Sequence, residues 1–217
     1  MRELYEEKGE RYYDRASWGV IGAVTPGKHR ILEIGCSAGK TGATLKQAGK
    51  AEEVVGVDLS PAAIAVAAER LDRAICCNIE ETGLPYPAEY FDYILCGDVL
   101  EHLQDPWTAL KKLNRYLKPD HFLIASIPNV RNWRVLRDLV LHGRWDYVQA
   151  GILDFTHLRF FTKRTIIELF DSAGFDVEEM GQLQFPRKEK LANILTLGFA
   201  KDFLVKQYLV KARKRHS

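Results

Sequence analysis

A glycine-rich turn early in the chain constrains the fold more than any other feature. Residues 31–42 (ILEIGCSAGKTG) run from a short apolar segment into this turn and then into a helical pattern. Gly35 and Gly39 allow a sharp turn and a close approach of the backbone to a ligand, because neither has a Cβ. A second apolar segment, residues 53–57, ends at Asp58. This order predicts a βαβ unit whose loop surrounds a nucleoside and whose carboxylate accepts the ribose hydroxyls.

Two phosphate-binding patterns fit this turn poorly. The dehydrogenase fingerprint requires glycine at its first, third and sixth positions, but the third position counted from Gly35 is Ser37. A P-loop requires four residues between its first glycine and Gly-Lys-Thr, and Gly35 stands one residue too close to Gly39. Asp98, which follows the apolar segment 93–96, has the place of a magnesium carboxylate in an ATPase. A P-loop-like nucleotide-binding protein therefore stays open as an alternative.

S-adenosylmethionine is a third candidate ligand, and it carries no phosphate. Its binding site needs only a carboxylate at the end of a strand, a loop whose backbone is not covered by side chains, and a slot for adenine. The turn resembles the first motif of class I S-adenosylmethionine-dependent methyltransferases, Glu-x-Gly-x-Gly-x-Gly. This motif corresponds to residues 33–39, with Ser37 in place of the middle glycine. Residues 77–80 resemble the motif that contacts adenine, with Asn78 where the family often has aspartate.

Later segments match the same family in the same order. Residues 91–102 resemble the motif of its fourth strand, and residues 117–126 resemble the helix end and strand that follow. The resemblance covers residues 29–180 and implies S-adenosylmethionine as the cofactor. Within the site we expect Glu33 to hold the turn by accepting backbone N–H groups. The implied cofactor-binding residues are Glu33, Gly35, Cys36, Ser37, Gly39, Asp58, Leu59, Asn78, Ile79, Cys96 and Gly97.

The alternation of apolar segments and helical patterns predicts an α/β fold with a doubly wound sheet. The resemblance implies a mostly parallel, seven-stranded sheet of the Rossmann-like methyltransferase fold with a helical lid insertion. After the first strand we expect strands at residues 53–58, 73–77, 91–96, 121–127, 175–180 and 203–212. We expect helices at residues 3–16, 40–48, 61–71, 106–118, 131–142, 162–173 and 188–202. Ligands of such sheets bind at the carboxyl ends of the strands.

Length and composition suit one globular domain. We expect the 217 residues to form a single methyltransferase domain, 1–217, with an N-terminal helix or lid at 1–25 and a substrate-covering insertion at 128–161. The net charge of +2 gives no reason to expect nucleic acid as a partner. No apolar run approaches the ~18 residues of a membrane span, and the first residues lack a signal peptide's apolar segment. We therefore expect a cytoplasmic protein.

The four cysteines do not predict a metal site. They fall at expected strand ends or in the turn, without the Cys-x-x-Cys pairs or interleaved histidines that zinc requires. We interpret them as small buried residues and expect no bound metal. They are Cys36, Cys76, Cys77 and Cys96.

His157 is the candidate catalytic base. The segment 154–162 resembles a stretch in methyltransferases of surface-polysaccharide and glycosyl-transfer pathways, and a Thr-His pair also precedes the equivalent helix in quinone-pathway O-methyltransferases. An imidazole with a pKa near neutrality suits deprotonation of a hydroxyl. A structural histidine bonded to Asp154 stays open as the alternative. Glu101 and His102 are interpreted as structural.

The charges of the insertion bear on the acceptor. Residues 131–164 carry an excess of four positive charges, which would favour a phosphorylated or nucleotide-linked acceptor. Trp133, Trp145 and Tyr147 could stack on sugar rings, but we interpret them as packing the insertion onto the sheet. We expect methylation of a small-molecule, glycan or lipid-linked acceptor, at oxygen rather than nitrogen, with a sugar precursor first and a quinone-type phenol second. A protein that binds the cofactor without catalysis stays open, and the sequence does not predict the oligomeric state.

Overall fold

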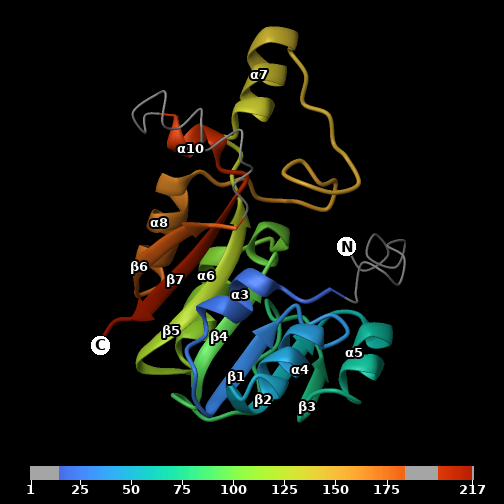
Figure 1. Ribbon diagram of the computed structural model, residues 1–217, viewed down its shortest axis with the longest axis vertical. Helices are drawn as coiled ribbons and strands as arrows, with labels where there is room; N and C mark the ends of the chain where they lie inside the picture. The colour runs from blue at the N-terminus through green and yellow to red at the C-terminus, as the bar shows by residue number, and fades with distance from the viewer. Residues whose placement is uncertain (1–14, 184–199, 217) are drawn as a thin grey trace.

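The computed structural model describes residues 15–183 and 200–216 (Figure 1). Its centre is a seven-stranded sheet with the order β3-β2-β1-β4-β5-β7-β6. β7 pairs antiparallel with both of its neighbours, and all other neighbouring strands pair in parallel. The predicted doubly wound, mostly parallel sheet is therefore confirmed.

The elements follow the predicted alternation. The strands are β1 (His29–Ile34), β2 (Ala51–Asp58), β3 (Arg73–Cys76), β4 (Phe91–Gly97), β5 (Leu117–Pro128), β6 (Phe175–Gln182) and β7 (Gln207–Lys214). The helices are α3 (Trp18–Ala23), α4 (Lys40–Gln47), α5 (Pro61–Ala67), the short 3₁₀ helix η1 (Leu100–His102), α6 (Pro106–Asn114), α7 (Trp133–His142), α8 (Lys163–Ser172) and α10 (Lys201–Leu204). None of the described helices is long and apolar enough to cross a bilayer.

Each face of the sheet packs against its own hydrophobic core, which explains why its central strands are mostly apolar. Ile31 of β1 lies in the core beneath α3, α4 and α5, whereas the next residue, Leu32, lies in the core beneath α6 and α8. β4 alternates in the same way, with Leu95 on the first side and Ile94 on the second. Both faces are covered, so a ligand can reach the sheet only at its ends.

The helices begin at the residues that the sequence favours. Ser60 Oγ accepts the Ala63 N–H at 3.3 Å at the start of α5, and Pro61 occupies the first turn. Asp105 caps α6 through the Thr108 N–H at 3.0 Å. These caps determine where each crossover leaves the carboxyl end of the preceding strand.

Some predicted boundaries are wrong. The helix expected to reach residue 118 ends at Asn114, and β5 begins at Leu117 instead of residue 121. Asp120 has a left-handed φ of 60°, which allows the strand to continue through an irregularity in its pairing with β4. The last strand was expected to begin at residue 203, but β7 begins at Gln207, after α10.

Two predicted helices lie largely outside the described residues. Most of the N-terminal helix at 3–16 and nearly all of the helix at 188–202 belong to the ranges 1–14 and 184–199. The insertion at 128–161 is described throughout, between β5 and α8. Its helix α7 projects beyond the carboxyl end of the sheet (Figure 1).

Candidate active site

A pocket of about 700 Å³ opens at the carboxyl ends of the central strands. Its size is typical of a small-molecule site. The glycine-rich loop after β1, the end of β2, the loop after β3 and the end of β4 all contribute to its wall. Among the residues predicted to bind the cofactor, the structure brings together here Glu33, Gly35, Cys36, Ser37, Asp58, Leu59, Asn78, Ile79 and Gly97.

The glycine-rich loop turns through left-handed backbone conformations. Gly35 has a φ of 66°, and Ser37 has a φ of 50° although it carries a side chain. A Cβ at Gly35 would lie 2.6 Å from Cγ2 of Val99, so this position requires glycine. The strained Ser37 is held by a hydrogen bond from its backbone N–H to Asp58 Oδ2 at 2.9 Å.

The Asp58 carboxylate links the loop to the end of β2. Oδ2 accepts the Ser37 N–H, and Oδ1 accepts the Ser60 N–H, each at 2.9 Å. Burial raises the pKa of Asp58, while these hydrogen bonds act in the opposite direction. Each carboxylate oxygen can accept more than one hydrogen bond. Support of the loop and contact with a ribose are therefore compatible roles for this residue.

Glu33 supports the same loop from the core side. Its Oε2 accepts the Gly42 N–H at 3.1 Å, and the Thr41 hydroxyl also interacts with the carboxyl group. Burial raises the pKa of Glu33 to about 8. Glu33 therefore accepts a backbone N–H group as expected, but from the first turn of α4 instead of the glycine-rich turn itself.

Gly39 and Cys96 lie away from the pocket. Gly39 precedes α4 with a φ of 76°, and a Cβ there would lie 3.2 Å from the Ala67 Cα. Close packing between the start of α4 and the end of α5 therefore explains why this position is a glycine. Cys96 is fully buried in the core on the α6 side. Sequence position alone could not separate these two residues from their neighbours that line the pocket.

The Asn78 side chain is bound within its own loop. Its Oδ1 accepts the Glu80 N–H at 3.0 Å, and its Nδ2 donates to Glu81 Oε1 at 2.8 Å. The amide therefore shapes the loop around the pocket, and Oδ1 keeps one lone pair for an adenine amine.

Sequence reasoning did not identify individual residues of the segment before β1 as part of the site. Ser17 and Trp18 line the pocket. The Ser17 N–H donates to Thr41 Oγ1 at 3.1 Å, which fixes this segment against the start of α4. Trp18 remains 72% exposed at the pocket. A single aromatic residue carries no spacing signal, so only its tertiary position reveals it.

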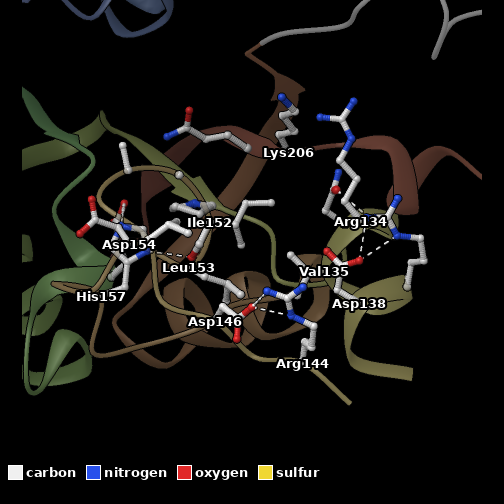
Figure 2. A pocket seen from close by; sticks show the side chains of 18 of the residues that line it. Arg134, Val135, Asp138, Arg144, Asp146, Ile152, Leu153, Asp154, His157 and Lys206 are labelled. Carbon is white, nitrogen blue, oxygen red and sulfur yellow. Dashed lines mark hydrogen bonds and ion pairs between the residues drawn. The ribbon is translucent and has the colours of Figure 1, made fainter. Parts of the chain in front are cut away.

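A second pocket of about 930 Å³ lies between the insertion and the end of the sheet (Figure 2). In Figure 2, His157 and Asp154 lie at one end, and Arg134, Asp138 and Arg144 lie at the other. Three residues line both pockets: Asp98, His102 and Gln207. The two pockets therefore meet at the end of β4.

His157 is buried at the inner end of the second pocket, with an exposed fraction of 8%. Its Nδ1–H donates to the Ile152 carbonyl at 2.9 Å. Its Nε2 lies 4.0 Å from Glu101 Oε1, and its ring stands edge to face with His102 at 4.7 Å between centroids. The Asp154 carboxylate accepts the N–H of Thr156 at 2.9 Å and its hydroxyl at 2.7 Å.

Glu101 is the most unusual carboxylate of the site. It is 1% exposed, and neither of its oxygens has a hydrogen-bond partner among the described residues. Burial raises the pKa of Glu101 well above its usual range, and the nearby Asp98 and Asp154 raise it further. Its backbone carbonyl accepts the N–H groups of Leu158 and Arg159 at 2.8 and 3.0 Å. These bonds attach the His157 loop to η1.

Acidic partners reduce the positive charge of the insertion. Arg137 pairs with Asp138 at 2.6 Å, and Arg144 pairs with Asp146. Arg134 and Lys206 also line the second pocket. Neither forms an ion pair with another residue in the part of the chain that the structure describes.

Of the three aromatic residues expected to pack the insertion onto the sheet, Trp145 is half-buried and stands edge to face with Phe160, whereas the other two are exposed. Trp133 is 38% exposed and Tyr147 is 55% exposed. The predicted amphipathic helix is confirmed as α7, but none of its residues is buried. Val140 and Leu141 also face outward. The interpretation failed because the helix projects from the sheet and only one of its sides borders the pocket.

Comparison with known proteins identifies the family. Residues 4–180 match the family described as methyltransferase domain. This match covers most of the chain, so the chain belongs to that family. It confirms the predicted class, S-adenosylmethionine-dependent methyltransferases, and with it the cofactor of that class. The methyltransferase family therefore replaces the alternative of a P-loop-like nucleotide-binding protein.

Curated relatives include ubiquinone biosynthesis O-methyltransferases. The Cereibacter sphaeroides protein is 31% identical over 164 residues, which cover 72% of this chain and 64% of the relative. The Bradyrhizobium diazoefficiens protein is 36% identical over 111 residues, which cover 48% of this chain and 42% of the relative. The matched part is thus less than two thirds of either relative.

Solved structures support the fold. An S-adenosylmethionine-dependent methyltransferase from Mesorhizobium loti superposes with a TM-score of 0.64 at 20% identity, covering 93% of this chain and 99% of that one. The YcgJ protein of Bacillus subtilis superposes with a TM-score of 0.63 at 20% identity, covering 91% and 97%. Both confirm the Rossmann-like methyltransferase architecture.

Proposed function

We propose that this protein transfers a methyl group from S-adenosylmethionine to a hydroxyl oxygen of a small-molecule acceptor. The observation that carries the proposal is the meeting of two pockets at Asp98, His102 and Gln207. The first pocket contains the loop and carboxylate that suit a nucleoside. The second is large enough for a separate acceptor and reaches the first at a single junction.

The chain's main contribution is alignment. When bound, S-adenosylmethionine supplies an electrophilic methyl group, whose bond to sulfur breaks as its bond to the acceptor oxygen forms, with the hydroxyl proton released to solvent. Asp58 and the glycine-rich loop would hold the nucleoside, and the insertion would hold the acceptor with its hydroxyl at the junction. Such positioning accounts for much of the rate gain in reactions of two substrates.

We propose that the acceptor carries an anionic group. Arg134 and Lys206 would bind this group at the second pocket, because neither is neutralised by a described acidic partner. The resemblance of the His157 segment favours a sugar or lipid-linked glycan precursor. The names of the curated relatives favour a phenol of the quinone type. The two acceptors share a hydroxyl, and the proposal requires that either one also carry an anionic substituent.

We further propose that residues 128–161 cover the acceptor within a single domain, 1–217, that works in the cytoplasm. α7 and the following loop form the outer wall of the second pocket, with Arg134 on the helix and His157 at the end of the loop. Their removal would leave the junction exposed to water.

Binding and turnover test the proposal separately. S-adenosylhomocysteine should bind with micromolar affinity in calorimetry, whereas ATP with Mg²⁺ should not bind. Labelled methyl transfer should then be measured with a dihydroxybenzoate and with a nucleotide sugar, and the methylated atom assigned by NMR. Transfer to oxygen of either compound identifies the acceptor class. Cofactor binding without turnover on any hydroxylated anion would support a protein that binds the cofactor but does not catalyse.

A further inference from the structure

Three side chains from distant parts of the chain gather where the two pockets meet. Glu101 and His102 belong to η1, directly after β4, and His157 comes from the loop before α8. One ligand atom from each residue lies within 4.8 Å of the others, and all three residues are buried. His102 lines both pockets, and Glu101 and His157 line the second.

The Glu101 carboxylate provides an independent indication of a missing partner. A buried carboxylate is normally paired or hydrogen-bonded, because its removal from water is costly. Glu101 is 1% exposed, yet neither oxygen has a hydrogen-bond partner among the described residues. His157 Nε2 lies 4.0 Å from Oε1, which is too long for a hydrogen bond. A cation between the side chains would satisfy the carboxylate.

Both imidazoles are oriented as metal ligands usually are. His102 Nδ1 lies 3.1 Å from the Thr156 carbonyl, and His157 Nδ1 lies 2.9 Å from the Ile152 carbonyl. A carbonyl only accepts, so each Nδ1 carries the proton, and in the neutral ring the lone pair belongs to Nε2. Backbone carbonyls commonly orient metal-binding histidines in this way.

Backbone hydrogen bonds bring these groups together. The Glu101 carbonyl accepts the N–H groups of Leu158 and Arg159, so the loop that carries His157 is bonded directly to η1. The Thr156 carbonyl contacts His102 from the same loop. The cluster is therefore part of the folded architecture.

We propose that Glu101, His102 and His157 bind a divalent first-row transition-metal ion. Two imidazoles and one carboxylate suit such ions better than Mg²⁺, and they leave coordination positions open. If the proposed O-methylation holds, an open position at the junction would bind the acceptor hydroxyl, lower its pKa and place its oxygen toward the first pocket. His157 is then a metal ligand instead of the catalytic base, and the expectation of no metal is reversed.

Cobalt provides a readout that does not depend on activity. The full chain, stripped with a chelator and dialysed, should bind one Co²⁺ with a visible absorption band, and Zn²⁺ or Mn²⁺ should compete better than Mg²⁺. Glu101→Gln and His157→Gln should each weaken Co²⁺ binding at least about tenfold, because loss of supporting residues alone costs that much. His121→Gln, on the half-exposed His121 beside Asp92, is the matched control and should bind normally.

The outcomes separate this proposal from the proposed function. Failure to bind Co²⁺ at one equivalent, or equal binding by both variants and the control, overturns the metal site. If Glu101→Gln does not fold, His102→Gln replaces it, and circular dichroism checks each variant. Full methyl transfer by the stripped protein would refute the role of the ion at the hydroxyl and leave O-methylation intact. Specific Co²⁺ binding without turnover on any acceptor would retain the site and overturn the proposed function.

Discussion

Replacement of Asp58 by alanine tests the nucleoside pocket most directly. The carboxylate already accepts two backbone N–H groups, from Ser37 and Ser60, each at 2.9 Å. A bound ribose would add hydroxyl donors to the same oxygens. Hydrogen bonds to a charged group contribute ~1.5–3 kcal/mol each, and ~1.4 kcal/mol corresponds to a factor of ten in affinity. Loss of one such bond therefore predicts at least about tenfold weaker binding of S-adenosylhomocysteine.

Two comparisons separate ligand contact from support of the loop. Asp58→Asn keeps one oxygen that can accept a backbone N–H, so it should retain more of the loop structure than Asp58→Ala. Asp72→Asn is the control, because Asp72 also accepts a strand N–H, from Val54 at 2.8 Å, but lies outside the pocket. Calorimetry at fixed pH gives the affinities, and thermal melting checks the fold. Unchanged affinity in a folded Asp58→Ala protein would refute the assignment.

Three further predictions concern the loop and the acceptor. Burial raises the pKa of Glu33 from its ordinary 4.5 to about 8. Between about pH 5 and 8 the folded chain therefore retains a proton that the unfolded chain releases, so the free energy of unfolding should fall as the pH rises through this range. Urea titrations across the range should show a weaker decline for Glu33→Gln than for the unaltered protein. Gly35→Ala should lower the melting temperature and weaken cofactor binding, because the added Cβ would clash with Val99. Gly49→Ala is the matched control: Gly49 also has a left-handed φ, of 68°, but no atom lies where its Cβ would stand, so this change should lower the melting temperature alone. Arg134→Ala should raise KM for an anionic acceptor by roughly tenfold without changing S-adenosylhomocysteine affinity; an equal effect from Arg164→Ala, at an exposed pair with Glu168, would contradict this.

The nucleoside half of the site was predictable because its chemistry is local in the sequence. The turn from Glu33 to Gly39 and the strand that ends at Asp58 belong to one βαβ unit, so their spacing alone predicts a shared pocket. The details required coordinates. Gly39 and Cys96 occupy motif positions, but Gly39 packs against α5 and Cys96 lies in the core. A motif indicates where the chain runs and does not determine which way each residue faces.

The acceptor half could not be predicted in the same way, because its contacts join distant segments. His157 meets Glu101 only after β5, α7 and a long loop have returned to the end of β4. α7 itself shows the limit of periodicity. Its pattern predicted an amphipathic helix, which is confirmed, but an apolar stripe does not indicate whether another element covers it. Here Val140 and Leu141 remain exposed.

The end of β4 connects the two halves of the site physically. Gly97 lines the first pocket, Asp98 lines both, and Glu101 lines the second. Asp98 has a left-handed φ of 56° and is fixed by the Ser126 hydroxyl at 3.0 Å, so the chain turns directly from the strand into η1. Glu101 stands three residues after Asp98, directly after this turn. The Asp98 charge accordingly raises the pKa of Glu101. Any cation bound by Glu101 would also stabilise Asp98, which couples the acceptor pocket electrostatically to the wall of the cofactor pocket.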